Sequence, residues 1–316
     1  MANATKLSVI MITGACRERA QYAIDSLDAQ NIDERFEIII ADLAGETNPP
    51  FIPPKTQDYD YIVLPAATTW GEARREALPK ASGDIIAFIE DHCFAEPDWA
   101  HNLLKAFASG PWAAVGYSIT NANPQTWISR AGLVSDYILW MAPVHDGESR
   151  LLPGNNVAYR SDVLMPLKDR LPNELSVDFN IHEHLLSNGH RLAMSANTLA
   201  KHQNYDNLGG LINANFYYCR MLAANRVKAQ NWTFFRRWLY IIGVPLGAPL
   251  IKLLRILKSL KGRKPLWGSF VLALPIIMIT FAVSAIGETL GYLLGAGNAA
   301  QDFNIWELYH QRTKNM

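Results

Sequence analysis

Short apolar runs alternate with amphipathic segments along the first third of the chain. Leu7–Thr13 has the sequence LSVIMIT, which is mostly apolar and rich in β-branched residues. Such a run predicts a strand that is buried on both faces of a sheet. Residues 17–30 and 72–80 instead carry apolar positions at helical spacing. The alternation predicts βαβ units and a doubly wound α/β sheet. Three further strand-like runs cover residues 36–42, 61–65 and 84–91.

Polar residues follow two of these predicted strands. Asp42 ends the second strand, and the sequence Glu90-Asp91-His92 ends the fourth. In open α/β sheets, ligands bind beyond the carboxyl ends of the strands. We therefore expect these side chains to converge on one ligand site.

The order of the segments between residues 6 and 204 resembles that of family 2 glycosyltransferases. The sequence ASGDIIAFIEDHCFAEPDW, at residues 81–99, resembles the family's strand, Asp-x-Asp motif and "p-x-w" element. The resemblance implies a GT-A fold, which is a Rossmann-like doubly wound domain with a mixed sheet. It also implies a nucleotide-sugar donor as substrate.

The resemblance assigns the donor site. Thr13 and Asp42 fall where the family holds the nucleotide base, and Gly71-Glu72-Ala73 matches the Gly-x-Ala helix that passes beneath the nucleotide. The donor-binding residues expected from this match are Thr13, Asp42, Gly71, Ala73 and Asp91.

The chain departs from the family at the metal motif, because Glu90-Asp91-His92 replaces Asp-x-Asp. Mg²⁺ and Mn²⁺ favour oxygen ligands, and Mn²⁺ accepts imidazole as well. Glu90 and His92 are therefore expected to hold Mn²⁺ or Mg²⁺ against the donor diphosphate, with Asp91 as an alternative ligand. His202 resembles a late metal or diphosphate ligand of the family. The alternative is that both histidines are structural.

Residues 153–160, PGNNVAYR, resemble the family's "G-g-N-x-a-x-R" element on the acceptor side. Glycine lets the backbone approach a sugar, and asparagine amides both donate to and accept from hydroxyls. A plain turn would also explain Gly-Asn-Asn. The expected acceptor-side residues are Gly154, Asn155, Asn156 and Arg160.

Inversion at an anomeric carbon needs a carboxylate that takes the proton of the acceptor hydroxyl. The family places this base in an acidic pair before a helix that ends in "R-L-x-x-x-G". Counting back from Gly189 puts Asp178 at that position, while Val177 replaces the preceding acid. Glu183 is the rival base.

The C-terminal third predicts association with a membrane. Residues 238–250 are apolar but contain Pro245 and Pro249, and alone they reach only about 20 Å as a helix. Residues 251–264 carry six cations among leucines and isoleucines, which is typical of an amphipathic helix on anionic lipids. Residues 266–286 contain no charged side chain over 21 positions, which is long enough to span a bilayer.

These patterns divide the chain into a GT-A domain over residues 1–232 and a membrane-associated segment over residues 233–316. We expect residues 238–264 to be interfacial or re-entrant and residues 266–294 to be a transmembrane candidate. The apolar run Leu7–Ile12 is short and is soon followed by arginines, so it predicts a strand and not a signal peptide. The catalytic domain is thus expected on the cytoplasmic side of the inner (plasma) membrane.

The charge balance changes this interpretation little. There are 29 Lys and Arg against 29 Asp and Glu, so no nucleic-acid partner is expected. The predicted function is inverting transfer of a sugar to a hydroxyl of a lipid-linked or cell-envelope glycan acceptor. One alternative is a glycosyltransferase-like membrane scaffold that has lost the chemistry. The other is a nucleotidyltransferase, but the Gly14-Ala15-Cys16-Arg17 loop has only one glycine.

Overall fold

The computed structural model describes residues 7–171 and 179–310, and the chain forms two compact units. The first unit contains Met1–Thr120 and Ala142–His202, and the second contains Asn121–Met141 and Gln203–Met316. Helix α8 (Leu208–Ala229) belongs to the second unit. The functional division after residue 232 stays a prediction.

A mixed sheet forms the centre of the first unit. Its strand order is β3-β2-β1-β4-β8-β6-β9-β5, with β7 paired to β9. Strands β1 to β4 pair in parallel, whereas β8 pairs antiparallel to both β4 and β6. This sheet confirms the predicted α/β fold class. The strands are β1 (Leu7–Thr13), β2 (Glu37–Asp42), β3 (Asp58–Val63), β4 (Ile85–Glu90), β5 (Cys93–Ala95), β6 (Trp112–Asn121), β7 (Gly147–Glu148), β8 (Val157–Arg160) and β9 (Arg191–His202).

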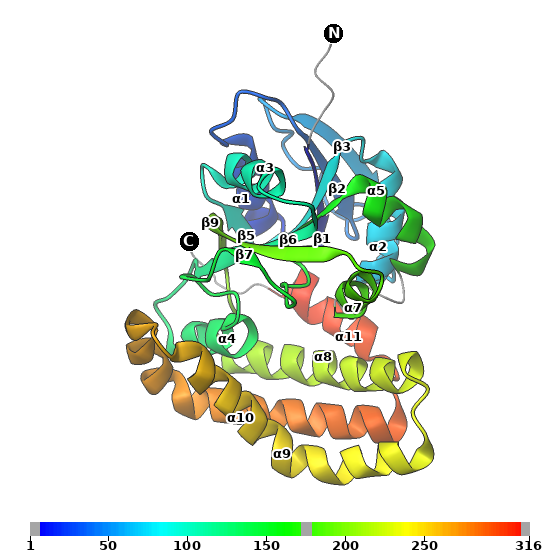
Figure 1. Ribbon diagram of the computed structural model, residues 1–316. Helices are drawn as coiled ribbons and strands as arrows, with labels where there is room; N and C mark the ends of the chain where they lie inside the picture. Colours follow the sequence, from blue (N-terminus) through cyan, green and yellow to red (C-terminus); the bar gives the residue numbers. More distant parts are fainter. Residues whose placement is uncertain (1–6, 172–178, 311–316) are drawn as a thin grey trace. The chain divides into compact units, whose positions relative to one another are not determined.

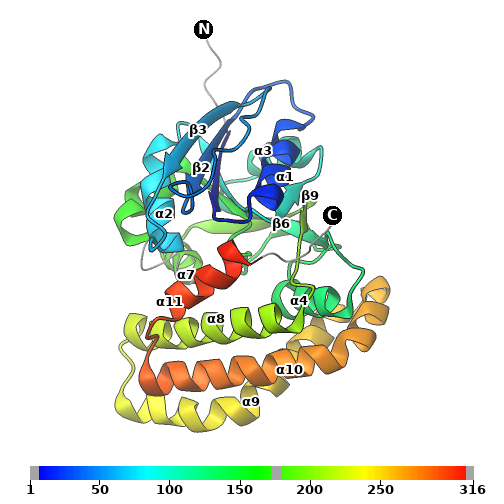
Figure 2. The same ribbon diagram turned by 180° about the vertical axis from the view of Figure 1, so that it is seen from behind.

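Helices cover both faces of the sheet. Figure 1 shows α1 and α3 on one side and α2 on the other, and Figure 2 shows the same layers from behind. All residues of β1 and β4 are buried, because these central strands are covered on both faces. The helical elements of this unit are α1 (Arg17–Asp28), α2 (Trp70–Ala77), η1 (Leu78–Lys80), α3 (Trp99–Ala108), α5 (Ser161–Leu164), η2 (Met165–Arg170) and α7 (Phe179–Ser187).

The second unit is helical. Helices α8, α9 and α10 lie side by side in both views (Figures 1 and 2). One apolar cluster of this unit joins Val134 of α4 and Ile138, which directly follows α4, to Ile256 and Leu260 of α9 and to Phe270 of α10. Besides α8, the elements are α4 (Trp127–Tyr137), α9 (Phe234–Leu260), α10 (Lys264–Leu294), α11 (Ala299–Asn304) and the π-helical turn η3 (Ile305–Tyr309).

Helix α9 runs without a break through Pro245 and Pro249, whereas the sequence analysis treated residues 238–250 as a separate short segment because of these prolines. Each proline removes a backbone hydrogen bond and crowds the carbonyl of the preceding turn, but Val244 packs in a cluster with Ala223 and Ala285 that stabilises this part of the helix. The 27-residue helix is about 40 Å long. Length therefore does not prevent α9 from crossing a membrane.

Two helices in the described part of the chain are long and apolar enough to cross a membrane, namely α9 and α10. Several apolar side chains of α9 are largely exposed; Leu246 is 82% exposed and Phe234 is 76% exposed. The candidate spans are identified by length and composition alone. Together with the exposed apolar side chains, they agree with membrane association of the C-terminal helices.

Two glycines let α10 approach α8 at backbone distance. A Cβ atom on Gly287 would come within 3.0 Å of the carbonyl oxygen of Phe216, and one on Gly291 would come equally close to that of Arg220. Real Cβ atoms do not make such contacts. The spacing of four residues thus gives the close helix packing that small residues permit in membrane helices.

Replacing Gly291 by alanine is expected to lower the free energy of unfolding by about 1–3 kcal/mol, because the added methyl group overpacks the helix contact. Gly268→Ala in the same helix is the matched control, since no atom lies within 4 Å of its Cβ position. It is expected to stabilise by about 0.5–1 kcal/mol through helix propensity. Thermal unfolding in detergent, followed by circular dichroism, measures both. Equal stabilisation by the two substitutions would contradict the close contact.

Helix α7 is attached to the sheet through a buried histidine. His182 is 2% exposed, and its Nε2 lies 2.9 Å from the hydroxyl oxygen of Tyr159 on β8. Burial, with a smaller contribution from the charge of Arg74, lowers the pKa of His182 from 6.5 to about 3. The folded protein therefore keeps this imidazole neutral.

This pKa predicts a loss of stability in mild acid. As the pH falls from 6.5 to 5, His182 becomes protonated in the unfolded chain but stays neutral in the folded protein. The free energy of unfolding therefore decreases by up to about 1.4 kcal/mol per pH unit. His182→Gln is expected to reduce this slope, whereas substitution of the exposed His190 is not. Urea unfolding at several pH values measures it. An unchanged slope in His182→Gln would refute the assignment.

Candidate functional site

The carboxyl ends of three parallel strands align at one edge of the sheet. Thr13 of β1 pairs with Asp42 of β2, and Ile12 of β1 pairs with Glu90 of β4. The register therefore places Thr13, Asp42 and Glu90, all named from the sequence, at the same edge. In open α/β sheets, this is the edge at which ligands bind.

Asp42 is the centre of a small polar and aromatic group. Its carboxylate accepts hydrogen bonds from Arg17 Nη1 and the Tyr61 hydroxyl, both at 2.5 Å, and from the Ala44 backbone N–H at 2.9 Å. The Arg17 guanidinium lies 3.6 Å from the centroid of the Phe51 ring. Arg17 and Tyr61 thus contact the buried Asp42 carboxylate directly, and Phe51 stacks on Arg17. None of the three was expected at the site from the sequence.

Asp91 is held inside the first unit. Arg19 donates hydrogen bonds of 3.0 and 3.1 Å to its two oxygens, Thr13 donates one of 3.3 Å, and His92 Nδ1 lies 2.8 Å away. Burial raises the pKa of Asp91, but the charge of Arg19 and the hydrogen bond with His92 outweigh burial, so the pKa lies below its usual value. Asp91 is therefore an anion paired with Arg19, and it orients His92.

Glu90 is held by the two asparagines of the turn before β8. Asn155 Nδ2 donates to Glu90 Oε1 at 2.9 Å, and Asn156 Nδ2 donates to Oε2 at 2.6 Å. Arg74 of α2 donates to Asn155 Oδ1 at 2.5 Å, which fixes the orientation of that amide. The two residues expected on the acceptor side therefore contact the acid of the metal motif directly.

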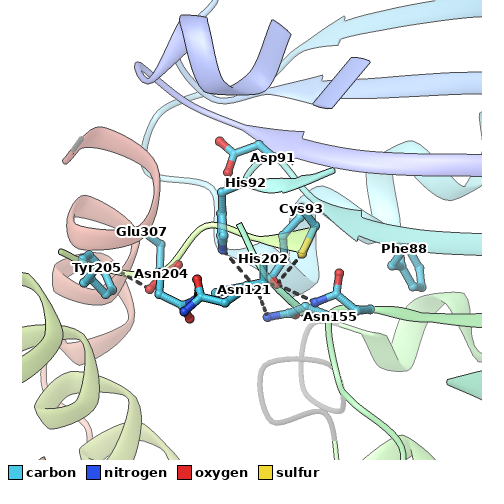
Figure 3. Close-up of polar contacts among 12 residues, drawn as sticks. Phe88, Asp91, His92, Cys93, Asn121, Asn155, His202, Asn204, Tyr205 and Glu307 are labelled. Atoms are coloured by element: carbon cyan, nitrogen blue, oxygen red, sulfur yellow. Dashed lines mark hydrogen bonds and ion pairs between the residues drawn. The ribbon is translucent and has the colours of Figure 1, made fainter. Parts of the chain in front are cut away.

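Cys93 and His202 lie beside the same carboxylate. They pair directly across β5 and β9, and opposed residues of antiparallel strands point to the same face. Glu90 Oε2 lies 3.5 Å from His202 Nε2 and 3.7 Å from Cys93 Sγ. One ligand atom from each of the three residues lies within 4.8 Å of the others, so the group could hold a metal ion. Figure 3 shows Cys93, His202, His92 and Asn155 directed toward one region.

His92, an expected ligand, lies next to this group. Its Nε2 is 3.7 Å from Glu90 Oε1, and its ring stands edge-on to that of His202 with centroids 4.8 Å apart. Cys93, which the sequence analysis did not name, takes part in the three-residue group instead. Its position next to the Glu90-Asp91-His92 motif and its residue type were the available signals.

The remaining residues that were expected on the donor and acceptor sides lie in α2, in the turn before β8 and at the far end of β8. Gly71 and Ala73 are buried in α2, the helix that packs on β1 and β2. Gly154 precedes the two asparagines in the turn. Arg160 pairs with Ile85, at the opposite end of β4 from Glu90, and donates to the backbone oxygen of Trp112. The structure thus does not bring Arg160 to the cluster.

Only one of the two candidate bases lies in the described part of the chain. Asp178 lies outside the described residues. Glu183 is a solvent-exposed residue of α7, and it follows the buried His182. Both assignments stay predictions.

Several known proteins are similar to this chain. A glucosyl-dolichyl phosphate glucuronosyltransferase of Haloferax volcanii is 24% identical over 174 residues, which are 51% of this chain and 54% of that protein. The chain thus matches about half the length of that curated relative. Mannosyltransferase PcManGT from Pyrobaculum calidifontis, solved with GDP-Man and Mn²⁺, has a TM-score of 0.54 at 16% identity, over 92% of this chain and 88% of that chain. S. aureus TarS 1–349 with UDP has a TM-score of 0.48 at 13% identity, over 93% and 91%.

The solved mannosyltransferase supports the fold, which the sheet order already defines. A sequence model of one protein family, Glycosyl transferase family 2, matches residues 8–165. That range is half of the chain, and it includes the aligned strand ends, the Glu90-Asp91-His92 motif and the turn with both asparagines. The chain therefore belongs to glycosyl transferase family 2.

Proposed function

We propose that this chain is an inverting glycosyltransferase that moves a sugar from a nucleoside-diphosphate donor to a hydroxyl group of an acceptor. The observation that carries the proposal is the alignment of strand ends. It puts the Asp42 group and the group of Glu90, Cys93 and His202 at one edge of one sheet. Family membership supports the same chemistry.

The spacing of the two groups suits a nucleotide. Strand β1 lies between β2 and β4, and neighbouring strands are about 4.8 Å apart, so Asp42 and Glu90 are separated by roughly 10 Å. We assign the nucleotide base to Asp42, with Phe51 and Tyr61 as its aromatic surroundings, and the diphosphate to the Glu90 side. Arg17 would have to release Asp42 if the carboxylate binds the base.

Glu90, Cys93 and His202 are the residues that would hold a divalent cation. A carboxylate, a thiol and an imidazole that meet at one point are ligand types found in metal sites. When bound, the cation supplies positive charge against the leaving diphosphate. Asn155 and Asn156 orient the Glu90 carboxylate, as outer partners of metal ligands commonly do.

Asp178 is our candidate for the general base, on the strength of its place in the family pattern. Its carboxylate takes the proton of the acceptor hydroxyl, whose oxygen forms a bond to the anomeric carbon. The bond from that carbon to the diphosphate oxygen breaks on the opposite face. Glu183 remains the rival.

Substitution of the base tests this function. Asp178→Asn is expected to lower kcat by about 10²- to 10⁴-fold and to leave nucleoside-diphosphate binding intact, while Asp169→Asn, at an exposed aspartate in η2, retains activity. Turnover of a panel of nucleotide sugars measures kcat, and thermal shift measures binding. Loss of activity only in Glu183→Gln would move the base to Glu183. A chain that neither binds nor turns over any donor would be the inactive scaffold instead.

We further propose that α9 and α10 hold the enzyme on the cytoplasmic face of the inner membrane, near a lipid-linked or cell-envelope glycan acceptor. The exposed apolar side chains of α9 support this, and so do the exposed cations Arg255, Lys258 and Lys261 beside them. The name of the curated relative includes a dolichyl phosphate, which is a lipid.

Vesicle flotation tests this attachment. The full chain is expected to float with vesicles that contain anionic lipid and to stay with them in high salt, because burial of apolar side chains is not screened. Replacing Arg255, Lys258 and Lys261 by glutamine should weaken initial binding to anionic vesicles, by about 1 kcal/mol per residue at most. A chain that stays in solution without detergent or lipid would contradict the proposal.

A further inference from the structure

The metal group of this chain differs in chemistry from a site made only of oxygen ligands. We propose that Glu90, Cys93 and His202 form a three-ligand site that selects a thiophilic divalent cation of the zinc class over Mg²⁺ and Mn²⁺, with the Cys93 sulfur as a direct ligand. The inference rests on the proposed function in one respect, which is that the open position of the cation faces the donor diphosphate.

The backbone places the sulfur at the site. Cys93 is the first residue of β5, and it pairs with His202, the last residue of β9. Residues opposed in this way have Cβ atoms about 4.5–5.5 Å apart on the same face. Glu90 ends β4 only three residues before Cys93. The short turn at Asp91 and His92 therefore keeps Glu90 and Cys93 close to each other. The sulfur is therefore fixed by sheet register and not by a mobile loop.

The carboxylate is oriented for ligation. Asn155 and Asn156 donate one hydrogen bond to each oxygen of Glu90. An ionised carboxylate has about four acceptor positions, so the two amide hydrogen bonds are compatible with a cation on the same carboxylate. Glu90 Oε2, the oxygen nearer Cys93 and His202, is the one placed to join them.

The donor set decides the class of cation. Zinc binds thiolate at about 2.3 Å and imidazole at about 2.0–2.1 Å, and catalytic zinc sites keep three protein ligands and an open fourth position. The three ligand atoms lie within 4.8 Å of one another, so small side-chain rotations bring them onto one ion. Mg²⁺ requires near-octahedral oxygen coordination, which a thiolate and an imidazole do not supply. Affinity at mixed ligands also rises from Mn²⁺ toward Zn²⁺.

Charge balance supports a divalent ion. Asp91 is already paired with Arg19, so its charge is compensated inside the protein. A cation that binds here displaces the proton of the Cys93 thiol to solvent, and a divalent cation then neutralises the two negative charges of the Glu90 carboxylate and the Cys93 thiolate. Burial of both ligands makes this compensation important, because an unpaired charge is costly in the interior.

Cobalt spectroscopy tests the proposal without any activity assay. The full chain in detergent, stripped with a chelator, is titrated with Co²⁺. We expect a sulfur-to-cobalt charge-transfer band in the near ultraviolet at one equivalent of metal. An equal amount of Zn²⁺ should abolish the band, whereas about a thousand-fold excess of Mg²⁺ or Mn²⁺ should not.

Three variants locate the sulfur ligand. Cys93→Ser is expected to lose the band, while Cys219→Ser, at another buried cysteine, retains it. Cys93→Asp exchanges sulfur for oxygen and should shift the preference toward Mn²⁺ by at least about tenfold. Circular dichroism checks that each variant is folded. If Cys93→Ser does not fold, the competition between Zn²⁺ and Mn²⁺ in the unaltered chain decides the question.

The outcomes separate this inference from the proposed function. A band that persists in Cys93→Ser, or Mn²⁺ that displaces Co²⁺ as well as Zn²⁺ does, overturns the inference. Nucleoside-diphosphate binding with Mn²⁺ and no sulfur band would leave the function standing and refute the zinc-class site. A sulfur band in a chain that binds no nucleotide would support the metal site and refute the transferase.

Discussion

The buried carboxylate of Glu90 is the constraint around which the site is built. A carboxylate at 3% exposure must be satisfied by hydrogen bonds or positive charge. Asn155 and Asn156 supply the hydrogen bonds, and Arg74 behind Asn155 keeps that amide in the donating orientation. The turn before β8, helix α2 and strand β4 are therefore linked through one side chain, so a change in any of them alters how the acid is presented.

Local pattern was enough to predict much of this architecture. The apolar runs of β1, β2 and β4 are buried in the sheet as expected, because runs this short and this rich in β-branched residues suit strands that are covered on both faces. Residues at the ends of such strands can be named from the sequence for the same reason. Thr13, Asp42 and Glu90 lie at the same edge of the sheet because parallel strands share their carboxyl edge.

Features that depend on pairing between strands far apart in the sequence could not be predicted from local sequence pattern. The pairing of Cys93 with His202 requires the register of β5 against β9, which pairs residues more than a hundred positions apart in the sequence. The link between Glu90 and the two asparagines likewise depends on β8 joining β4 antiparallel. Pro245 and Pro249 led to the expectation of a separate short segment for a related reason. Tertiary packing around Val244 stabilises α9 as one helix across both prolines.

The two glycines of α10 determine how far the contact between α8 and α10 depends on the surrounding solvent. Contact of Gly287 and Gly291 with the carbonyl groups of α8 relies on shape and van der Waals attraction, and it immobilises no side chain. Attraction of this kind does not depend on expelling water. The α8–α10 pair can therefore keep the same geometry when hydrocarbon chains replace water around it.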